Sequence, residues 1–258
     1  NNNVVLGYGA GFDMTSGNSN VAVGYNAGAN VTSSNLNTFV GWEAGKTLTD
    51  TGIVNVGIGC SALQAMTTGT QNTALGGNAG YLLTTGGNNV LIGHNAGDGF
   101  DTESNNLAVG KDALGGAVAG GENNVAVGNY TLDALTTADY NTAVGYAAGS
   151  AKTSGNHCTF IGYDAGLNCT TGTDVTFVGS EAGDGHDTES YNTGVGSGAL
   201  GGPIAGGEYN VAVGTYTLDA LTSGDQNTAV GYNAGTSVTT HSDGVFIGWQ
   251  AGDNAITG

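Results

Sequence analysis

The sequence predicts an all-β fold, a parallel β-solenoid (β-roll) of about 15 coils with 17–18 residues each. Three observations predict it. A Gly recurs every 17 or 18 residues, a Val, Ile or Leu precedes each of these Gly residues, and an aliphatic residue or Thr lies two positions earlier still. A short, fixed repeat period is typical of solenoids, in which each coil packs mainly on its two neighbours.

The recurring Gly defines fifteen units that cover almost the whole chain. Its positions are Gly7, Gly24, Gly41, Gly59, Gly76, Gly93, Gly110, Gly128, Gly145, Gly162, Gly179, Gly196, Gly214, Gly231 and Gly248. A period of 86 residues overlies this one, because the stretch 96–149 nearly repeats at 182–235. We therefore interpret residues 1–258 as a single repeat array with super-repeats at approximately 1–86, 87–172 and 173–258. Because the chain opens in the middle of a repeat, we expect a fragment of a longer fibre.

The three residues before each Gly form the predicted strand. Val21 and Val23, or Thr38 and Val40, show the spacing of two residues that is typical of β-strands. A helix is excluded by the frequency of Gly and by the absence of a 3.6-residue period. Each unit is therefore expected to contain a short strand, a Gly-centred bend, a second short segment and a polar turn.

Two further columns complete the predicted coil. An Asn opens the strand in 12 of 15 units, as in Asn3, Asn20 and Asn37, and stacked Asn side chains are expected to form a hydrogen-bonded ladder. An Ala three residues after the Gly fits a tight corner, and the Gly that usually follows it, such as Gly28, indicates positive φ. Five units carry Leu in place of that second Gly, at Leu63, Leu114, Leu132, Leu200 and Leu218.

The middle residue of the strand is apolar or Gly in all fifteen units. The residues on either side of it, which point to the opposite face, are aliphatic or Thr. Strands that are apolar on both faces are buried on both faces, and a 17-residue coil is too small to enclose two cores. The sequence therefore predicts self-association, although it leaves open which apolar face meets the axis. The large middle residues are predicted at the oligomer interface: Phe39, Leu91, Phe160, Phe177 and Phe246.

The charge balance excludes two classes of partner. The formal net charge is −18, there is no Arg, and the lysines are Lys46, Lys111 and Lys152. Nucleic-acid binding depends on cationic side chains that neutralise phosphates, and anionic membrane surfaces also attract cations. No run of apolar residues is long enough for a membrane span, so we expect no membrane insertion of this segment.

The units NVAVGYNAG at 20–28, NTAVGYAAG at 141–149 and NTAVGYNAG at 227–235 resemble the head repeats of trimeric autotransporter adhesins. The segment YTLDALTTADYNTAVG at 130–145 is similar to repeats of phage tail-fibre-like proteins. The resemblance implies a trimeric, extracellular β-roll on a virion or a cell surface. It also implies a structural or adhesive fibre segment that presents, or contributes to, receptor attachment. The coil is longer here than in the adhesin heads.

Two acidic turns are candidate calcium sites. Each places three carboxylates within six residues beside a Gly: Asp98, Asp101 and Glu103 in one, and Asp184, Asp187 and Glu189 in the other. Calcium requires several oxygen ligands. Acidic residues with Gly also form ordinary surface turns, and both interpretations remain open. No other cofactor is expected.

An aromatic column follows the recurring Gly and is a candidate glycan-binding surface. It contains Tyr8, Tyr25, Trp42, Tyr146, Tyr163, Tyr232 and Trp249. Such residues could bind the sugar rings of a cell-surface glycan or receptor, or could only stack on one another and stabilise the sheet. Paired threonines, such as Thr67-Thr68 and Thr136-Thr137, suggest ice binding as a further alternative.

No residues point to catalysis. The four histidines share no column, and Gly-rich matches such as GYGAG are products of the repeat. We therefore expect a protein that is not an enzyme. Cys158 and Cys169 fall within one repeat, where a disulfide and free thiols are both compatible with the sequence.

Overall fold

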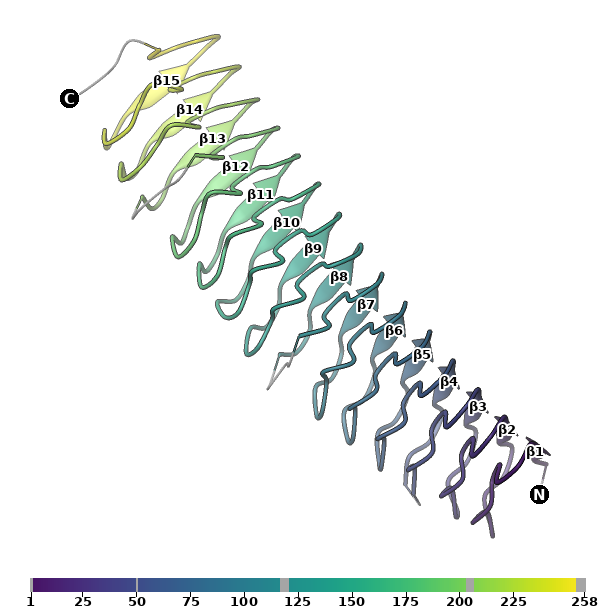
Figure 1. Ribbon diagram of the computed structural model, residues 1–258. Coiled ribbons are helices and arrows are strands. Elements are labelled where there is room, and N and C mark those ends of the chain that lie inside the picture. The colour runs from purple at the N-terminus through teal and green to yellow at the C-terminus, as the bar shows by residue number, and fades with distance from the viewer. Residues whose placement is uncertain (1, 50, 117–120, 203–206, 254–258) are drawn as a thin grey trace. The chain divides into compact units, whose positions relative to one another are not determined.

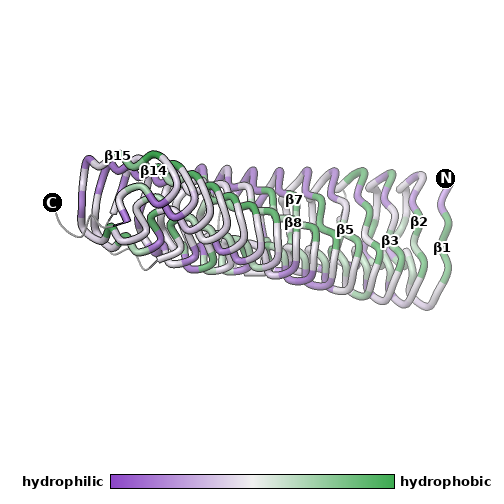
Figure 2. The backbone as a smooth tube through the Cα atoms, turned by 90° about the horizontal axis from the view of Figure 1, so that it is seen from above, coloured by the Kyte–Doolittle hydropathy of each residue, from purple (hydrophilic) through white to green (hydrophobic). Residues whose placement is uncertain are grey.

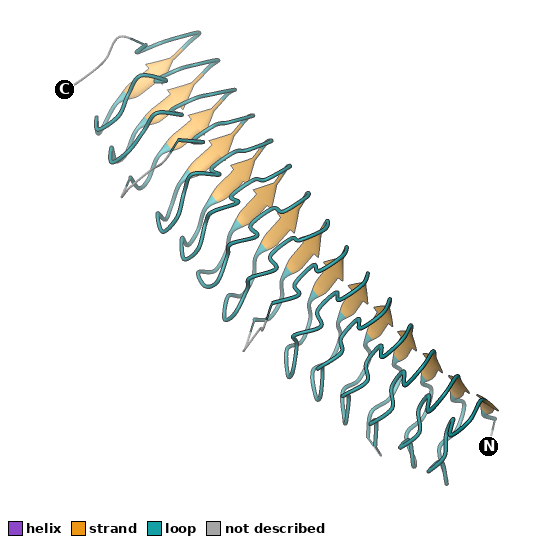
Figure 3. Ribbon diagram, in the orientation of Figure 1, coloured by secondary structure: helices purple, strands orange, loops and turns teal. Residues whose placement is uncertain are grey.

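The computed structural model describes residues 2–49, 51–116, 121–202 and 207–253, and it confirms the all-β solenoid. Each coil contributes one strand of three residues, and no helix occurs in the described ranges (Figure 3). The strands are β1 (Val4–Leu6), β2 (Val21–Val23), β3 (Thr38–Val40), β4 (Val56–Ile58), β5 (Thr73–Leu75), β6 (Val90–Ile92), β7 (Leu107–Val109), β8 (Val125–Val127), β9 (Thr142–Val144), β10 (Thr159–Ile161), β11 (Thr176–Val178), β12 (Thr193–Val195), β13 (Val211–Val213), β14 (Thr228–Val230) and β15 (Val245–Ile247). The predicted strand positions are therefore confirmed.

The chain divides into two compact units, Asn1–Tyr130 with β1 to β8 and Thr131–Gly258 with β9 to β15. Within each unit, consecutive strands pair in parallel and in sequence order (Figure 1). The register aligns equivalent residues of the repeat, as in Ala22 with Phe39 or Phe160 with Phe177. Each column of the sequence therefore becomes a row of side chains along its unit.

The middle residue of each strand lies in the core of its own coil. Phe39, Leu91, Phe160 and Phe177 are buried within the single chain, and Phe246 in the last strand is partly buried. The prediction that these five residues form an oligomer interface is therefore wrong. The physical reason is the alternation of the strand: with the middle residue inward, the first and third residues point outward.

A second row of core residues lies seven positions after the recurring Gly. It holds apolar side chains such as Leu48, Met66 and Leu83, all of them fully buried. Figure 2 shows the hydrophobic residues gathered along the strands, while the turns are mainly hydrophilic. The inner faces of strand and turn thus enclose one narrow core per coil.

Large and small core residues compensate within a coil. Where the middle residue is Phe39, the corner carries Gly45, and a Cβ added there would lie 2.3 Å from the Phe39 ring. Where the middle residue is Gly57, the corner carries Leu63, whose Cδ1 would contact a Cβ at position 57 at 3.5 Å. The five corner leucines are fully buried and have φ between 49° and 54°. Burial of Leu offsets the cost of a left-handed backbone.

The recurring Gly is required by its backbone. At Gly145, φ is 143°, and a Cβ would lie 2.1 Å from the carbonyl oxygen of Gly162 in the next coil. The close approach of successive coils at this bend leaves no space for a side chain. The positive φ predicted for the corner Gly is also confirmed, for example at Gly28 with 54°.

The predicted Asn ladder is confirmed. The Oδ1 of Asn55 accepts hydrogen bonds from the main-chain N–H of Asn72 at 2.9 Å and from its Nδ2 at 3.2 Å. The same Nδ2 donates to the carbonyl of Gly86 at 2.9 Å, across the coil. Each buried Asn therefore joins two coils and closes its own turn.

Candidate functional site

The aromatic column lies on the surface immediately after the bend of each coil. All seven predicted side chains are exposed. In the first unit Tyr8 and Tyr25 stack with centroids 5.6 Å apart at 10°, and Tyr25 and Trp42 stack at 6.3 Å and 8°. In the second unit Tyr146 and Tyr163 stack at 5.8 Å and 12°. Tyr232 and Trp249 occupy the same column in the last two coils of the array.

Stacking along the column covers one or both faces of five of the seven rings. Tyr25 lies between Tyr8 and Trp42, so both of its faces meet other rings and its edge meets solvent. A sugar ring binds an aromatic side chain through the ring face. The column as a whole is therefore a stabilising stack, and an open face is left only where the aromatic run ends.

The run in the first unit ends at Trp42. The next two residues of the column are Cys60 and Gly77, which are small, and His94 follows them. A Cβ on Gly77 would meet only the Cδ2 of His94, at 3.5 Å. The side of the Trp42 indole that faces away from Tyr25 is therefore not covered by another ring.

A cavity of about 780 Å³ lies beside this open face, and we call it the Trp42 groove. Its lining includes Trp42, Glu43, Lys46, Cys60, Gln64 and Asp98. Strands β3 to β6 set the spacing of these side chains, since the lining residues come from four columns of the repeat. The groove thus combines an aromatic wall with polar side chains from four successive coils.

The polar wall of the groove is ordered by hydrogen bonds. The Glu43 carboxylate accepts hydrogen bonds from Lys46 Nζ at 2.8 Å and from Gln64 Nε2. Glu43 is buried although it is charged, and this pairing offsets the cost of its burial. Burial, and then the neighbouring Asp112, raises the pKa of Asp98 above its ordinary value.

The structure separates the residues of each predicted calcium turn. Glu103 is buried, and its carboxylate accepts hydrogen bonds from the main-chain N–H groups of Asp101 at 2.5 Å and Thr102 at 2.9 Å. Asp101 accepts from the Thr84 hydroxyl, whereas Asp98 lies in the Trp42 groove. The first turn is therefore held by protein donors.

The second acidic turn follows the same pattern. Glu189 accepts from the N–H groups of Asp187 at 2.9 Å and Thr188 at 3.1 Å, and Asp187 accepts from the Thr170 hydroxyl at 2.7 Å. Asp184 lies in a small cavity with Glu181 and Asp219. Across the described residues, no three His, Cys, Asp or Glu side chains gather in a group that could hold a metal ion.

The two threonines of each pair have different surroundings. The first hydroxyl donates to a carbonyl of the next coil, as from Thr67 to Thr84 at 3.2 Å and from Thr136 to Thr153 at 2.8 Å. The second residue, such as Thr68 or Thr137, is exposed. Half of the threonines that ice binding would need are therefore occupied by bonds between coils.

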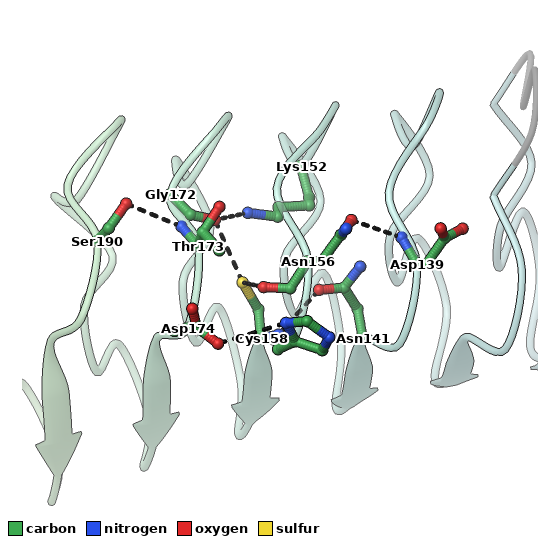
Figure 4. Close-up of polar contacts among 10 residues, drawn as sticks. Asp139, Asn141, Lys152, Asn156, Cys158, Gly172, Thr173, Asp174 and Ser190 are labelled. Carbon is green, nitrogen blue, oxygen red and sulfur yellow. Dashed lines mark hydrogen bonds and ion pairs between the residues drawn. The ribbon is translucent and has the colours of Figure 1, made fainter.

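Three polar residues occupy consecutive positions of the second core row, at Lys152, Cys169 and His186, and all are fully buried. Figure 4 shows Lys152 directed at the carbonyl of Gly172, to which the Cys158 thiol also donates at 3.2 Å. Lys152 Nζ lies 3.8 Å from Cys169 Sγ, and burial raises the pKa of Cys169 to about 11. Cys158 and Cys169 are free thiols.

The outer face of the strands is aliphatic at the third residue of every strand, which is Val, Ile or Leu. The first residue is Val or Leu in eight strands and Thr in seven, and most residues of this face are partly exposed. The exposed members inside the array include Ile58, Ile161, Val195, Val211, Val213 and Val230. The second apolar face expected from the sequence therefore exists, but different residues form it.

Sequence reasoning missed the Trp42 groove and the buried Lys152. Both could have been found by comparing equivalent positions of successive repeats. The aromatic column changes to Cys60 and Gly77 after Trp42, and the row seven residues after the recurring Gly is apolar until Lys152. Nothing in a single coil signals either feature, because each depends on neighbours 17 residues away.

Among the described residues, no helix has the length and apolar character needed to cross a membrane. Comparisons with protein-family models, with curated proteins and with solved structures gave no match to this chain.

Proposed function

We propose that the chain is a structural and adhesive segment of an extracellular fibre, on a virion tail or a cell surface, and that it has no enzymatic activity. The observation that carries this proposal is the row of aliphatic third residues on the outer face of the strands, which recurs in every coil. A contiguous apolar surface of this kind marks an interaction site, since solvent exposure of such a patch is costly. A surface that repeats coil by coil fits a partner with the same repeat, which is another copy of the chain.

The proposed assembly is a homotrimer in which the first and third strand residues meet. The number three follows from the resemblance to adhesin heads, and the choice of face follows from the burial of the middle residues. The net charge of −18 keeps the outer surface soluble and disfavours nucleic acids and anionic membranes as partners.

Light scattering combined with size-exclusion chromatography tests the assembly. We expect three times the mass of one chain. Val230→Lys with Ile161→Lys places charges on the outer face and is expected to give single chains with an unchanged β-type circular dichroism spectrum. Thr137→Lys with Thr171→Lys adds the same charge at exposed turn positions and is the control. A monomeric unmodified protein, or a trimer that tolerates the outer-face lysines, would refute the proposed assembly.

We propose glycan binding as a second function, because the Trp42 groove combines an open indole face with polar side chains. Ligand sites have this composition in general: apolar and aromatic walls with a few placed polar groups. A glycan array tests it. Loss of the signal on Trp42→Ala would support binding in the Trp42 groove. Loss on Trp249→Ala alone would instead place binding at the other end of the aromatic column, and a uniformly silent array would leave only the structural role.

A further inference from the structure

We propose that the Trp42 groove binds one neutral pyranose ring of a glycan, stacked on the indole face that Cys60 leaves open. The inference rests on the glycan-binding function proposed above and gives it one location and one ligand class. The sugar binds at Trp42, where the aromatic run ends, and the other stacked residues of the run hold Trp42 in place.

The spacing of the column provides the space for a ring. Neighbouring aromatic residues stack with centroids 5.6 Å and 6.3 Å apart, so each coil advances the column by about one stacking distance. At the Cys60 position the next ring is missing, and the following residue is Gly77. A ligand ring beside Trp42 would take the place of the side chain that the repeat omits here.

Tyr25 fixes the orientation of the indole. It stacks on the opposite face of Trp42 with an interplanar angle of 8°. Trp42 is thereby held with its open face toward the groove before any ligand binds. A preorganised aromatic wall lowers the ordering cost of binding.

The opposite wall supplies partners for hydroxyl groups. Glu43 is held by Lys46 and Gln64, and Ser61, Asn78 and Asp98 also line the groove. Carboxylates accept strong hydrogen bonds from hydroxyl donors, and amides both donate and accept. A pyranose ring offers several hydroxyls around an apolar C–H face, which matches an aromatic wall beside a polar one.

The charge of the groove selects against acidic sugars. Glu43 and Asp98 contribute two carboxylates to the lining, against the single ammonium of Lys46. Lys46 is already paired with Glu43 at 2.8 Å. The whole chain carries a net charge of −18, which adds long-range repulsion of anions.

Fluorescence of Trp42 measures this binding directly. The chain contains two tryptophans, so Trp249→Phe leaves Trp42 as the only one. The full chain with this change is titrated with the methyl glycosides of glucose, galactose, mannose and N-acetylglucosamine, and with N-acetylneuraminic acid as the anionic comparison. We expect a saturable change with at least one neutral glycoside, with a Kd in the millimolar range typical of a single small ligand, and none with the acidic sugar.

Cys60→Tyr is the decisive variant, because it continues the stack and covers the open face of Trp42. We expect at least tenfold weaker binding with a melting temperature that is not lowered. Ser180→Tyr makes the matched change in the second unit, where Ser180 follows Tyr163 in the same column, and should leave binding unchanged. It also shows whether a tyrosine in this column is tolerated.

The inference would be overturned by the absence of a saturable change with any neutral glycoside, or by unaltered binding by a folded Cys60→Tyr protein. A positive glycan array with a silent Trp42 would also overturn it while leaving glycan binding itself in place. The mass measurement on the trimer is independent of all these outcomes.

Discussion

A histidine occupies a core position at residue 186, where the equivalent residue of the preceding super-repeat is Phe100. His186 packs on the ring of Phe177 with centroids 4.7 Å apart. Its ring nitrogens are buried without a hydrogen bond of normal geometry among the described residues. Burial lowers the pKa of His186 to about 4, against smaller opposing effects of the Glu189 carboxylate and the Leu200 main chain.

The stability of the second unit should therefore decrease in mild acid. Between about pH 6.5 and pH 4 the unfolded chain binds a proton at His186 that the folded chain does not bind, so stability falls as the pH falls through this window. The loss is about 3 kcal/mol at most. His186→Phe should raise the melting temperature at pH 7 and, by a larger amount, at pH 4.5. An equal gain at both pH values would contradict this account.

Adjacent glycines differ sharply in what they tolerate. At Gly76, φ is 141°, and a Cβ would lie 2.3 Å from the carbonyl oxygen of Gly93. Gly77 has ordinary backbone geometry, and its nearest contact would be His94 at 3.5 Å. Only at Gly76 does the close approach of the next coil exclude every residue with a side chain.

Gly76→Ala should lower the free energy of unfolding by about 3 kcal/mol or more, since both the backbone and the next coil must shift. Gly77→Ala, one residue away, should change it by less than about 0.5 kcal/mol. Urea denaturation followed by circular dichroism measures both. Similar effects for the two variants would mean that the bend is less tightly packed than its distances indicate.

At the scale of the element, the Asn ladder holds one coil to the next. Asn72 donates to Asn55 and Gly86, and its Oδ1 accepts from the main-chain N–H of Asn89 at 3.0 Å. These groups are buried, so each that loses its partner costs about 1–3 kcal/mol. The side chain of the ladder therefore contributes as much as a core residue.

Asn72→Ala should destabilise the first unit by about 2–4 kcal/mol, because it leaves the Gly86 carbonyl and the Asn89 N–H without partners. Chemical denaturation measures the loss. Asn30→Ala is the control, since Asn30 is exposed in the same unit and does not have a left-handed backbone. Equal effects of the two variants would show that the ladder adds nothing beyond turn preference.

At the scale of the whole molecule, the large negative charge raises the question of whether divalent cations stabilise the protein. Glu103 and Glu189, which the sequence offers as calcium ligands, are buried and accept main-chain N–H groups. A calcium ion at these turns would have to replace bonds that already exist. We therefore expect Tm to be unchanged by EDTA.

Thermal melting with EDTA, with excess calcium and with the same ionic strength of sodium chloride separates the alternatives. Screening of the net charge should raise Tm similarly with either salt. A calcium-specific increase, lost on Asp98→Asn or Asp184→Asn, would establish the site that the sequence suggests.

The periodic sequence by itself determined the solenoid, the position of every strand, the Gly at each bend and the Asn ladder. These features could be predicted from equivalent positions of the repeat, because stacked coils place equivalent residues in contact. Each such position therefore has to satisfy the same steric or hydrogen-bonding requirement in every coil. The existence of two apolar faces was also evident from the pattern.

Only the tertiary structure decided which of these faces is inside, and hence that Phe39, Leu91, Phe160 and Phe177 form the core, with Phe246 partly buried. Alternation along a strand is the same whether the middle residue points in or out, so the curvature of the rest of the coil makes that choice. The same limit applies to the Trp42 groove. A missing ring is visible in the column, but an open face and a polar wall exist only once neighbouring coils are stacked.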